Sequence, residues 1–337
     1  MGKHERQEIE NAEKILVDLL NKKDLSHTQK INKWITHCFE LEKVIRSDFD
    51  TIKSVEHIGN IYGKGEIGDI KILTENDPRW LYIELKMSET PRGKGTLANI
   101  SQDALTNSKL FFGDNLFSWN NFRNNKHFDH KVIDELNKYN KYPDLLNRGS
   151  TNSQISKKAV FLKKKIQNFL GLSHRASIAN MICSHIKTKG IAEIAQICCN
   201  IINMAREDKI SYLNYLSKIT QNEENIKKFA IAMLIGYHTK NQLNHILSIH
   251  YYEILKILES YYVYYTNEKS GKVRVSSDDL GKDISQILQQ NLRIEFPKEQ
   301  TNCLIKSDNK TILRIVFHWK NKFQGIETPC LNIFKEF

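Results

Sequence analysis

Three charged residues, Asp69, Glu84 and Lys86, have the types and the spacing to act together on a phosphate ester. Two carboxylates attract a hard divalent cation such as Mg²⁺, which prefers oxygen ligands and keeps several waters. Such a cation acidifies one of its waters for attack on phosphorus, and it neutralises charge that develops on the phosphate. A lysine beside the cation is suited to orient the water or, as the neutral amine, to deprotonate it, and its ammonium form is suited to hold a nonbridging oxygen. This chemistry requires a fold that brings the three side chains to one place.

Two short apolar runs carry these residues, 70–73 and 80–85, and a turn-forming Glu-Asn-Asp-Pro sequence separates them. Runs of this kind predict a β-hairpin or two neighbouring strands. Successive strand side chains point to opposite faces, so we expect Glu84 and Lys86 to share one face. The backbone carbonyl of Leu85 lies between these two residues and is a further candidate ligand for the metal ion.

The chain has Gly68-Asp69, then fourteen intervening residues, then Glu84-Leu85-Lys86. This pattern resembles the signature of the PD-(D/E)xK nuclease superfamily, which includes type II restriction endonucleases. The resemblance implies an α/β (α+β) fold, with a restriction-endonuclease-like mixed sheet flanked by helices. It also implies a Mg²⁺-dependent phosphodiesterase in which Asp69 and Glu84 bind the metal and Lys86 is the catalytic lysine. Glycine stands at position 68 where the name of the family has proline, a departure that many members share.

The motif is short, and the resemblance covers only residues 48–110 or so. Glu-x-Lys triplets arise by chance in a chain with 26% charged residues, and a second one stands at 207–209. A similar Asp-Asn-Lys triplet at 308–310 is typical of a hairpin turn. The triplet at Glu84 differs from both because it sits on a strongly apolar strand with Gly-Asp upstream. The alternative interpretation is an exposed strand pair with ordinary surface charges.

Further carboxylates are candidates for the same site. The related nucleases often supply an acidic residue from a helix that precedes the core sheet, so the resemblance implies a role for Glu40 or Glu42 on the helix predicted over 29–46. Glu66 is close to Asp69 in the sequence and is an additional candidate. The alternatives are solvated surface charge for the two helical residues and a loop charge for Glu66.

Small and basic residues follow the second strand, in a loop whose backbone is able to approach DNA phosphates. Ser88, Arg92 and Lys94 are the candidate contacts there, and the alternative is an ordinary surface loop. A helix is predicted over 99–110. Gln102, near the start of that helix, is either another DNA contact or a plain polar position.

The residue pattern changes from helical periodicity to strand alternation at Thr266. The short segments of alternating apolar and polar residues after it predict a small antiparallel sheet. The last predicted strand displays Arg314, His318 and Lys320 at alternate positions on one face. Arginine and lysine donate to guanine edges in the major groove, and Asn321 just beyond is suited to pair with adenine. The alternative is an exposed polar face of a sheet.

Composition narrows the class of protein. A formal net charge of +11 and a pI of about 9.2 favour a polyanionic partner, since DNA affinity comes largely from neutralised phosphates. The alternative is a general basic bias, because Lys, Asn and Ile are all abundant. A chain of 337 residues, 40% of them hydrophobic, is long enough for two or three domains with a substantial core.

Cysteine usage and hydropathy bear on the compartment. None of the six cysteines forms a Cys-x-x-Cys pair or has zinc-finger spacing, which favours a reduced, cytoplasmic protein. The charged start of the chain and the lack of a long apolar run predict neither a signal peptide nor a membrane span.

Helical periodicity dominates the middle of the chain, over 178–204 and 225–265. The predicted C-terminal sheet begins with the segment 272–277. We therefore predict three consecutive segments: a catalytic nuclease core with N-terminal helices over 1–125, a helical DNA-binding or dimerisation segment over 126–265, and a β-rich segment, suited to target recognition, over 266–337.

The resemblance thus implies a type II restriction endonuclease, part of a restriction-modification system, that hydrolyses double-stranded DNA at a specific short sequence by attack of a metal-activated water. Mg²⁺ is the expected cofactor, double-stranded DNA is the expected partner, and a palindromic target favours a homodimer. The alternatives are a repair or recombination nuclease of the same fold and a non-enzymatic, basic DNA-binding protein.

Overall fold

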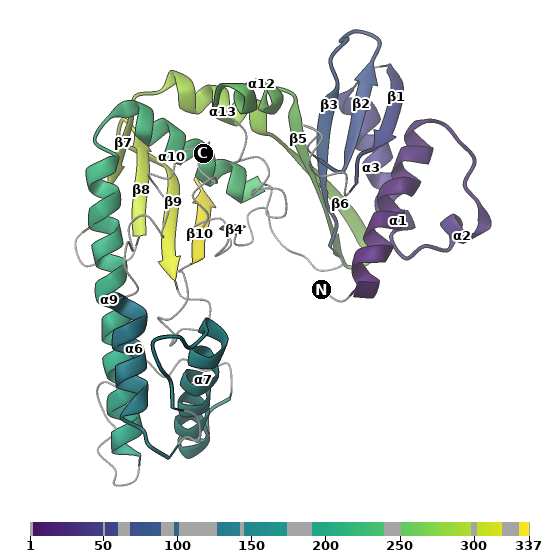
Figure 1. Ribbon diagram of the computed structural model, residues 1–337. Coiled ribbons are helices and arrows are strands. Elements are labelled where there is room, and N and C mark those ends of the chain that lie inside the picture. Colours follow the sequence, from purple (N-terminus) through teal and green to yellow (C-terminus); the bar gives the residue numbers. More distant parts are fainter. Residues whose placement is uncertain are drawn as a thin grey trace. The chain divides into compact units, whose positions relative to one another are not determined.

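A computed structural model gives the fold of this chain (Figure 1) and shows the mixed α/β class expected from the sequence. The chain forms two compact units, and each unit is built from two separate segments: Met1–Ala98 with Ala230–Asn291 in unit 1, and Asn99–Phe229 with Leu292–Phe337 in unit 2. The structure describes residues 3–49, 51–59, 68–88, 98–100, 127–141, 145–173, 191–238, 251–297, 302–318 and 330–336.

Unit 1 contains a mixed five-stranded sheet with the strand order β1-β2-β3-β5-β6. Its strands are β1 (Ile52–His57), β2 (Ile70–Thr74), β3 (Leu81–Lys86), β5 (Tyr261–Lys269) and β6 (Lys272–Asp279). The first three strands pair antiparallel, β3 pairs parallel with β5, and β5 pairs antiparallel with β6. The predicted hairpin is therefore confirmed as β2–β3, with β3 in the middle of the sheet.

Two helices from the N-terminal segment lie side by side on this sheet, α1 (Lys3–Leu20) and α3 (Ile35–Asp48), as Figure 1 shows. Leu16 of α1 and Leu41 of α3 pack against the buried strand residues Ile72 and Ile83 in one apolar core. The short helix α2 (His27–Lys30) lies between these two helices in the sequence, and Ser26 is its N-cap, with a capping box. The core thus holds α1 and α3 over β2 and β3.

Strand β5 was not predicted, because the helical assignment over 225–265 ran through it. The helices there are α10 (Glu223–His238) and α12 (Tyr251–Leu258), and the chain enters β5 at Tyr261. A central strand next to a parallel neighbour is buried on both faces, so its apolar run lacks the alternation that distinguishes a strand from a helix. The aromatic and β-branched sequence Tyr-Tyr-Val-Tyr-Tyr-Thr was the available signal.

Strand β6 corrects a second prediction, because residues 272–277 belong to the sheet of unit 1 and not to the C-terminal sheet. After β6 the helix α13 (Leu280–Gln289) begins, with Asp279 as its N-cap. Gly281 at its start packs so closely on the end of α12 that a Cβ there would lie 2.7 Å from the carbonyl oxygen of Glu259.

Unit 2 combines helices with an antiparallel sheet. The helices are α6 (His127–Asn137), α7 (Asn152–Phe169) and α9 (Ala192–Ile219). The strands are β7 (Leu292–Glu295), β8 (Asn302–Ser307), β9 (Lys310–His318) and β10 (Cys330–Lys335), with β4 (Ala98–Ile100) beside β10. Residues 98–100 form this short strand where the sequence predicted the start of a helix, and the rest of that predicted helix lies outside the described residues.

The two units differ from the three consecutive segments expected from the sequence. The reason is pairing between distant parts of the chain: β5 and β6 complete the sheet of β1–β3, so residues on both sides of position 265 belong with the N-terminal segment. Sequence periodicity reports local structure and contains no direct record of such long-range pairing.

Cysteine chemistry also departs from the expectation of free thiols throughout. Cys199 is disulfide-bonded, whereas Cys38, Cys198 and Cys303 are free and buried. In the part of the chain that the structure describes, none of the helices is long and apolar enough to cross a membrane.

Candidate active site

The position of Asp69 follows from the glycine that precedes it. Gly68 has a φ of +103°, which favours glycine, and a Cβ on it would lie 2.8 Å from the carbonyl oxygen of Ile83. The close approach places Asp69 directly beside β3, where its N–H donates to that same oxygen at 2.8 Å. The Asp69 side chain then reaches further along β3, and Oδ2 accepts from the backbone N–H of Leu85 at 2.7 Å. Glycine at position 68 is thus a requirement of this backbone.

Strand β3 supplies the other two motif residues. Glu84 is 2% exposed, and its Oε1 accepts from the ammonium of Lys86, whose side chain is 27% exposed. The contact shows that both side chains occupy the same face of β3, as the strand alternation predicted. The second oxygen, Oε2, accepts from the hydroxyl of Tyr261 on the neighbouring strand β5 at 3.1 Å.

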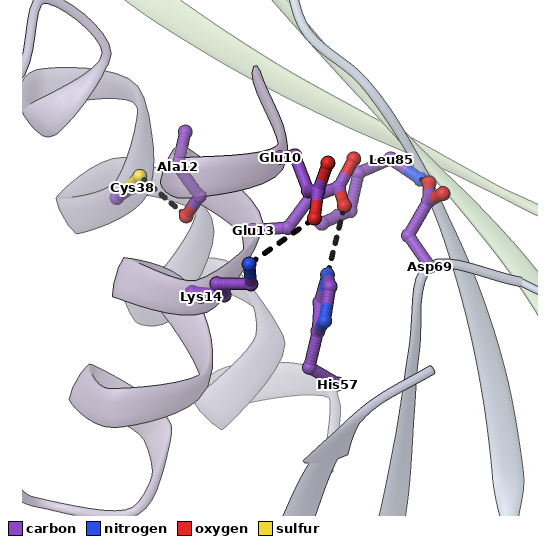
Figure 2. A network of polar contacts seen from close by, with 8 residues as sticks. All are labelled: Glu10, Ala12, Glu13, Lys14, Cys38, His57, Asp69 and Leu85. Carbon is purple, nitrogen blue, oxygen red and sulfur yellow. Dashed lines mark hydrogen bonds and ion pairs between the residues drawn. The ribbon is translucent and has the colours of Figure 1, made fainter. Parts of the chain in front are cut away.

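A carboxylate that the sequence analysis missed lies at the same place. Glu13 of α1 is buried, and its Oε2 contacts Nε2 of His57 on β1 at 3.0 Å. Figure 2 shows the Glu13 carboxylate pointing from the helix toward the strand region that carries Asp69 and Leu85. The signal was present in the sequence, since Glu13 falls on the apolar face of α1, four residues after Ile9 and three before Leu16.

The charges of Glu13, Glu84 and Lys86 all influence the pKa of Asp69. Burial, followed by the charges of Glu84 and Glu13, raises the pKa of Asp69 well above its ordinary value, although Lys86 and the Leu85 N–H act in the opposite direction. Burial acts to lower the pKa of Lys86, but the carboxylates of Glu84, Asp69 and Glu13 outweigh it and raise that pKa. The raised pKa of Asp69 shows that its negative charge is disfavoured beside Glu84 and Glu13, and a divalent cation bound there would favour the ionised form.

The donor set therefore fits a hard cation: Asp69, Glu84 and Glu13 offer the carboxylate oxygens that Mg²⁺ prefers. Within the described ranges, no three His, Cys, Asp or Glu side chains already form a metal-binding group. Each carboxylate instead has a protein donor: the Leu85 N–H, the Lys86 ammonium or the His57 ring. Binding of a cation would require these oxygens to exchange or share their present partners.

Two of the three predicted accessory acids, Glu40 and Glu42, lie on α3. Glu42 forms an ion pair with Arg46 at 2.9 Å, and Nη2 of Arg46 also donates to the backbone oxygens of Leu19 and Leu20 at the end of α1. Glu40 is half-buried on the same helix. Neither residue is among the charges that shift the pKa of Asp69, whereas Glu13 is. The helix that supplies an acid to this site is thus α1.

The remaining predicted contacts fall into three groups. Leu85 packs its side chain into the core and gives its N–H to Asp69, and its role as a carbonyl ligand stays a prediction. Ser88 is half-buried just beyond β3. The third predicted accessory acid, Glu66, lies outside the described residues, and so do the predicted DNA contacts Arg92, Lys94, Gln102, Lys320 and Asn321.

The predicted row of side chains on β9 lies in unit 2. Arg314 forms an ion pair with Glu336 at 3.0 Å, and its guanidinium lies 4.2 Å from the ring centroid of Phe334. His318 is the last residue of β9. The Arg314 side chain is 41% exposed, so it has both protein partners and access to solvent.

No protein-family model matches the chain, and no curated protein matches it.

Proposed function

We propose that this protein is a Mg²⁺-dependent endonuclease of the PD-(D/E)xK type that hydrolyses double-stranded DNA, with the specificity of a type II restriction endonuclease. The observation that carries the proposal is the meeting of Asp69, directly before β2, with Glu84 and Lys86 of the adjoining strand β3. Glu13 of α1 is close enough to raise the pKa values of Asp69 and Lys86. The motif alone predicted only residue types and spacing. The fold adds burial, mutual electrostatic influence and a third carboxylate.

The roles follow from the chemistry of each group. Asp69, Glu84 and Glu13 would hold Mg²⁺, and a bound Mg²⁺ supplies positive charge against the phosphate and makes water more acidic. Lys86 keeps its proton, because the carboxylates raise its pKa, and so it is suited to hold a nonbridging phosphate oxygen. The partial exposure of Lys86 gives it the access to a DNA backbone that buried Glu84 lacks.

Double-stranded DNA is the substrate that the net charge of +11 favours, since each neutralised phosphate adds to affinity. The proposed DNA contacts are two groups of polar residues in the sequence: Ser88, Arg92, Lys94 and Gln102, which follow the motif, and Arg314, His318, Lys320 and Asn321 near the end of the chain. A homodimer with one active site for each strand is the assembly that a palindromic target would need.

The test is incubation of the purified chain with plasmid DNA and Mg²⁺, followed by sequencing of the fragment ends, with excess EDTA as the control. We expect cuts at one short recurring sequence, with 5′-phosphate ends, and no cuts in EDTA. Metal-dependent cuts at scattered positions would instead favour a repair or recombination nuclease. DNA binding without any cutting across a range of sequences and divalent cations would contradict an enzymatic role.

A further inference from the structure

Tyr261 is the one described residue outside the motif whose hydroxyl donates directly to the Glu84 carboxylate. Its side chain is completely buried at the start of β5. The two oxygens of Glu84 are thereby divided between two donors, since Oε2 accepts from Tyr261 and Oε1 accepts from Lys86. A carboxylate held at both oxygens has a fixed plane, whereas a carboxylate held at one oxygen can rotate.

The sheet explains how Tyr261 reaches Glu84 from so far along the chain. Strands β3 and β5 run parallel with Tyr82 opposite Tyr261, so Glu84 is the next residue of β3 on the same face. A diagonal neighbour of this kind lies within reach of a long aromatic side chain. The N–H of Tyr82 donates to the carbonyl oxygen of Ser260 at 2.8 Å, which anchors the start of β5 at this register.

The hydroxyl is in the protonation state that this contact requires. Burial, with the neighbouring charges of Glu84 and Asp69, raises the pKa of Tyr261 well above its ordinary value. A tyrosine hydroxyl has an ordinary pKa of about 10, so it is a donor at neutral pH and adds no negative charge beside Glu84.

We propose that Tyr261 is a positioning residue that orients Glu84 for cation binding by holding Oε2. This inference rests on the proposed function, because it assigns to Tyr261 the support of a group that binds the metal. Residues that support metal ligands through hydrogen bonds typically contribute about 10–100-fold to metal affinity or activity. Loss of the hydroxyl alone is therefore expected to weaken cation binding by about that factor.

Strand β5 supplies a matched control. Tyr264 lies on the same strand, is 1% exposed, and donates its hydroxyl to a carboxylate as well, Oδ2 of Asp48 at 2.8 Å. Asp48 is at the end of α3 and belongs to no part of the proposed site. Tyr264→Phe thus removes an equivalent buried hydrogen bond from β5 without touching Glu84.

The experiment compares the full chain with Tyr261→Phe and Tyr264→Phe. Isothermal titration with Mg²⁺, and with Ca²⁺ in parallel, gives the dissociation constant of the cation without DNA, and thermal unfolding gives the stability of each variant. We expect the cation dissociation constant of Tyr261→Phe to rise about 10–100-fold and that of Tyr264→Phe to stay within about twofold of the wild type. Thermal midpoints should fall by similar amounts in the two variants.

Equal cation affinity in Tyr261→Phe and the wild type would overturn the assignment, and so would an equal loss in both variants, since that would mark a merely structural hydrogen bond. A wild-type chain that binds no cation would overturn it as well. Should Tyr261→Phe not fold, Tyr261→Met fills the same buried space without a hydroxyl and carries the same expectation. If the wild type binds the cation and Tyr261→Phe binds it weakly, but no DNA is cut, the positioning role stands and the nuclease function fails.

Discussion

At the scale of single residues, the site places carboxylates where they are unfavourable for folding. Asp69 is surrounded by a buried protein interior and by the charges of Glu84 and Glu13, and its pKa is raised in consequence. Groups of this kind concentrate at functional sites, where the property needed for chemistry opposes stability. Removing the charge should therefore stabilise the fold while it removes the activity.

Asp69→Asn tests this relation through pH. In the window between the pKa of an unfolded aspartate, about 3.9, and the raised pKa of Asp69, the folded state binds more protons than the unfolded state. The contribution of Asp69 to stability therefore falls as pH rises through this window and stays low above it. We expect metal-free Asp69→Asn to unfold at a higher temperature than the wild type at pH 7, with the difference shrinking toward pH 4. Scanning calorimetry across this range measures it, and a difference that grows toward acid would contradict the account.

The contribution of Glu13 can be tested apart from that of the motif residues, with a control variant on the same helix. Glu13→Gln removes one of three proposed cation ligands, and we expect cutting at limiting Mg²⁺ to fall by about 100-fold or more. Glu8→Gln is the control, because Glu8 is a partly exposed residue of α1 that forms an ion pair with Lys33 at 3.0 Å. Cleavage rates at several Mg²⁺ concentrations give the answer. Similar rates for both variants would exclude Glu13 from the site.

At the scale of elements, the close approach of the chain before β2 to strand β3 determines where the site residues lie. Gly68→Ala adds a Cβ within 2.8 Å of a backbone oxygen of β3 at a positive φ, and we expect a loss of about 2–4 kcal/mol in the free energy of unfolding. Gly271→Ala, also at a positive φ but with no atom within 4 Å of the added Cβ, should cost only about 1–2 kcal/mol. Urea unfolding compares the two, and equal losses would show that the close approach to β3 is unimportant.

Local sequence patterns predicted part of this arrangement. The β2–β3 hairpin was predictable because a turn sequence separates two apolar runs, and the shared face of Glu84 and Lys86 followed from strand alternation. The pairing of β5 with β3, and with it the contact from Tyr261, was not predictable, because it joins segments that no local period connects. Glu13 was predictable in part: the sequence shows a carboxylate on the apolar face of a helix, but it does not show which strand residues that carboxylate lies near.

At the scale of the whole molecule, net positive charge should govern DNA affinity. A chain with a charge of +11 that neutralises about 6–10 phosphates should lose about 10³–10⁵ in affinity between 50 and 200 mM salt. Fluorescence anisotropy with a labelled duplex, in Ca²⁺ to suppress cutting, measures the slope. An affinity that hardly changes with salt would contradict binding through the DNA backbone.

The sharpest test of the site compares plasmid cleavage in Mg²⁺ by the wild type, Asp69→Ala and Glu84→Ala, with DNA binding measured for the same samples. Loss of a metal or an electrostatic contact in the transition state predicts a fall in cutting by about a thousandfold or more for each variant, while each still binds DNA. Near-normal cutting by either variant would contradict the assignment of the site.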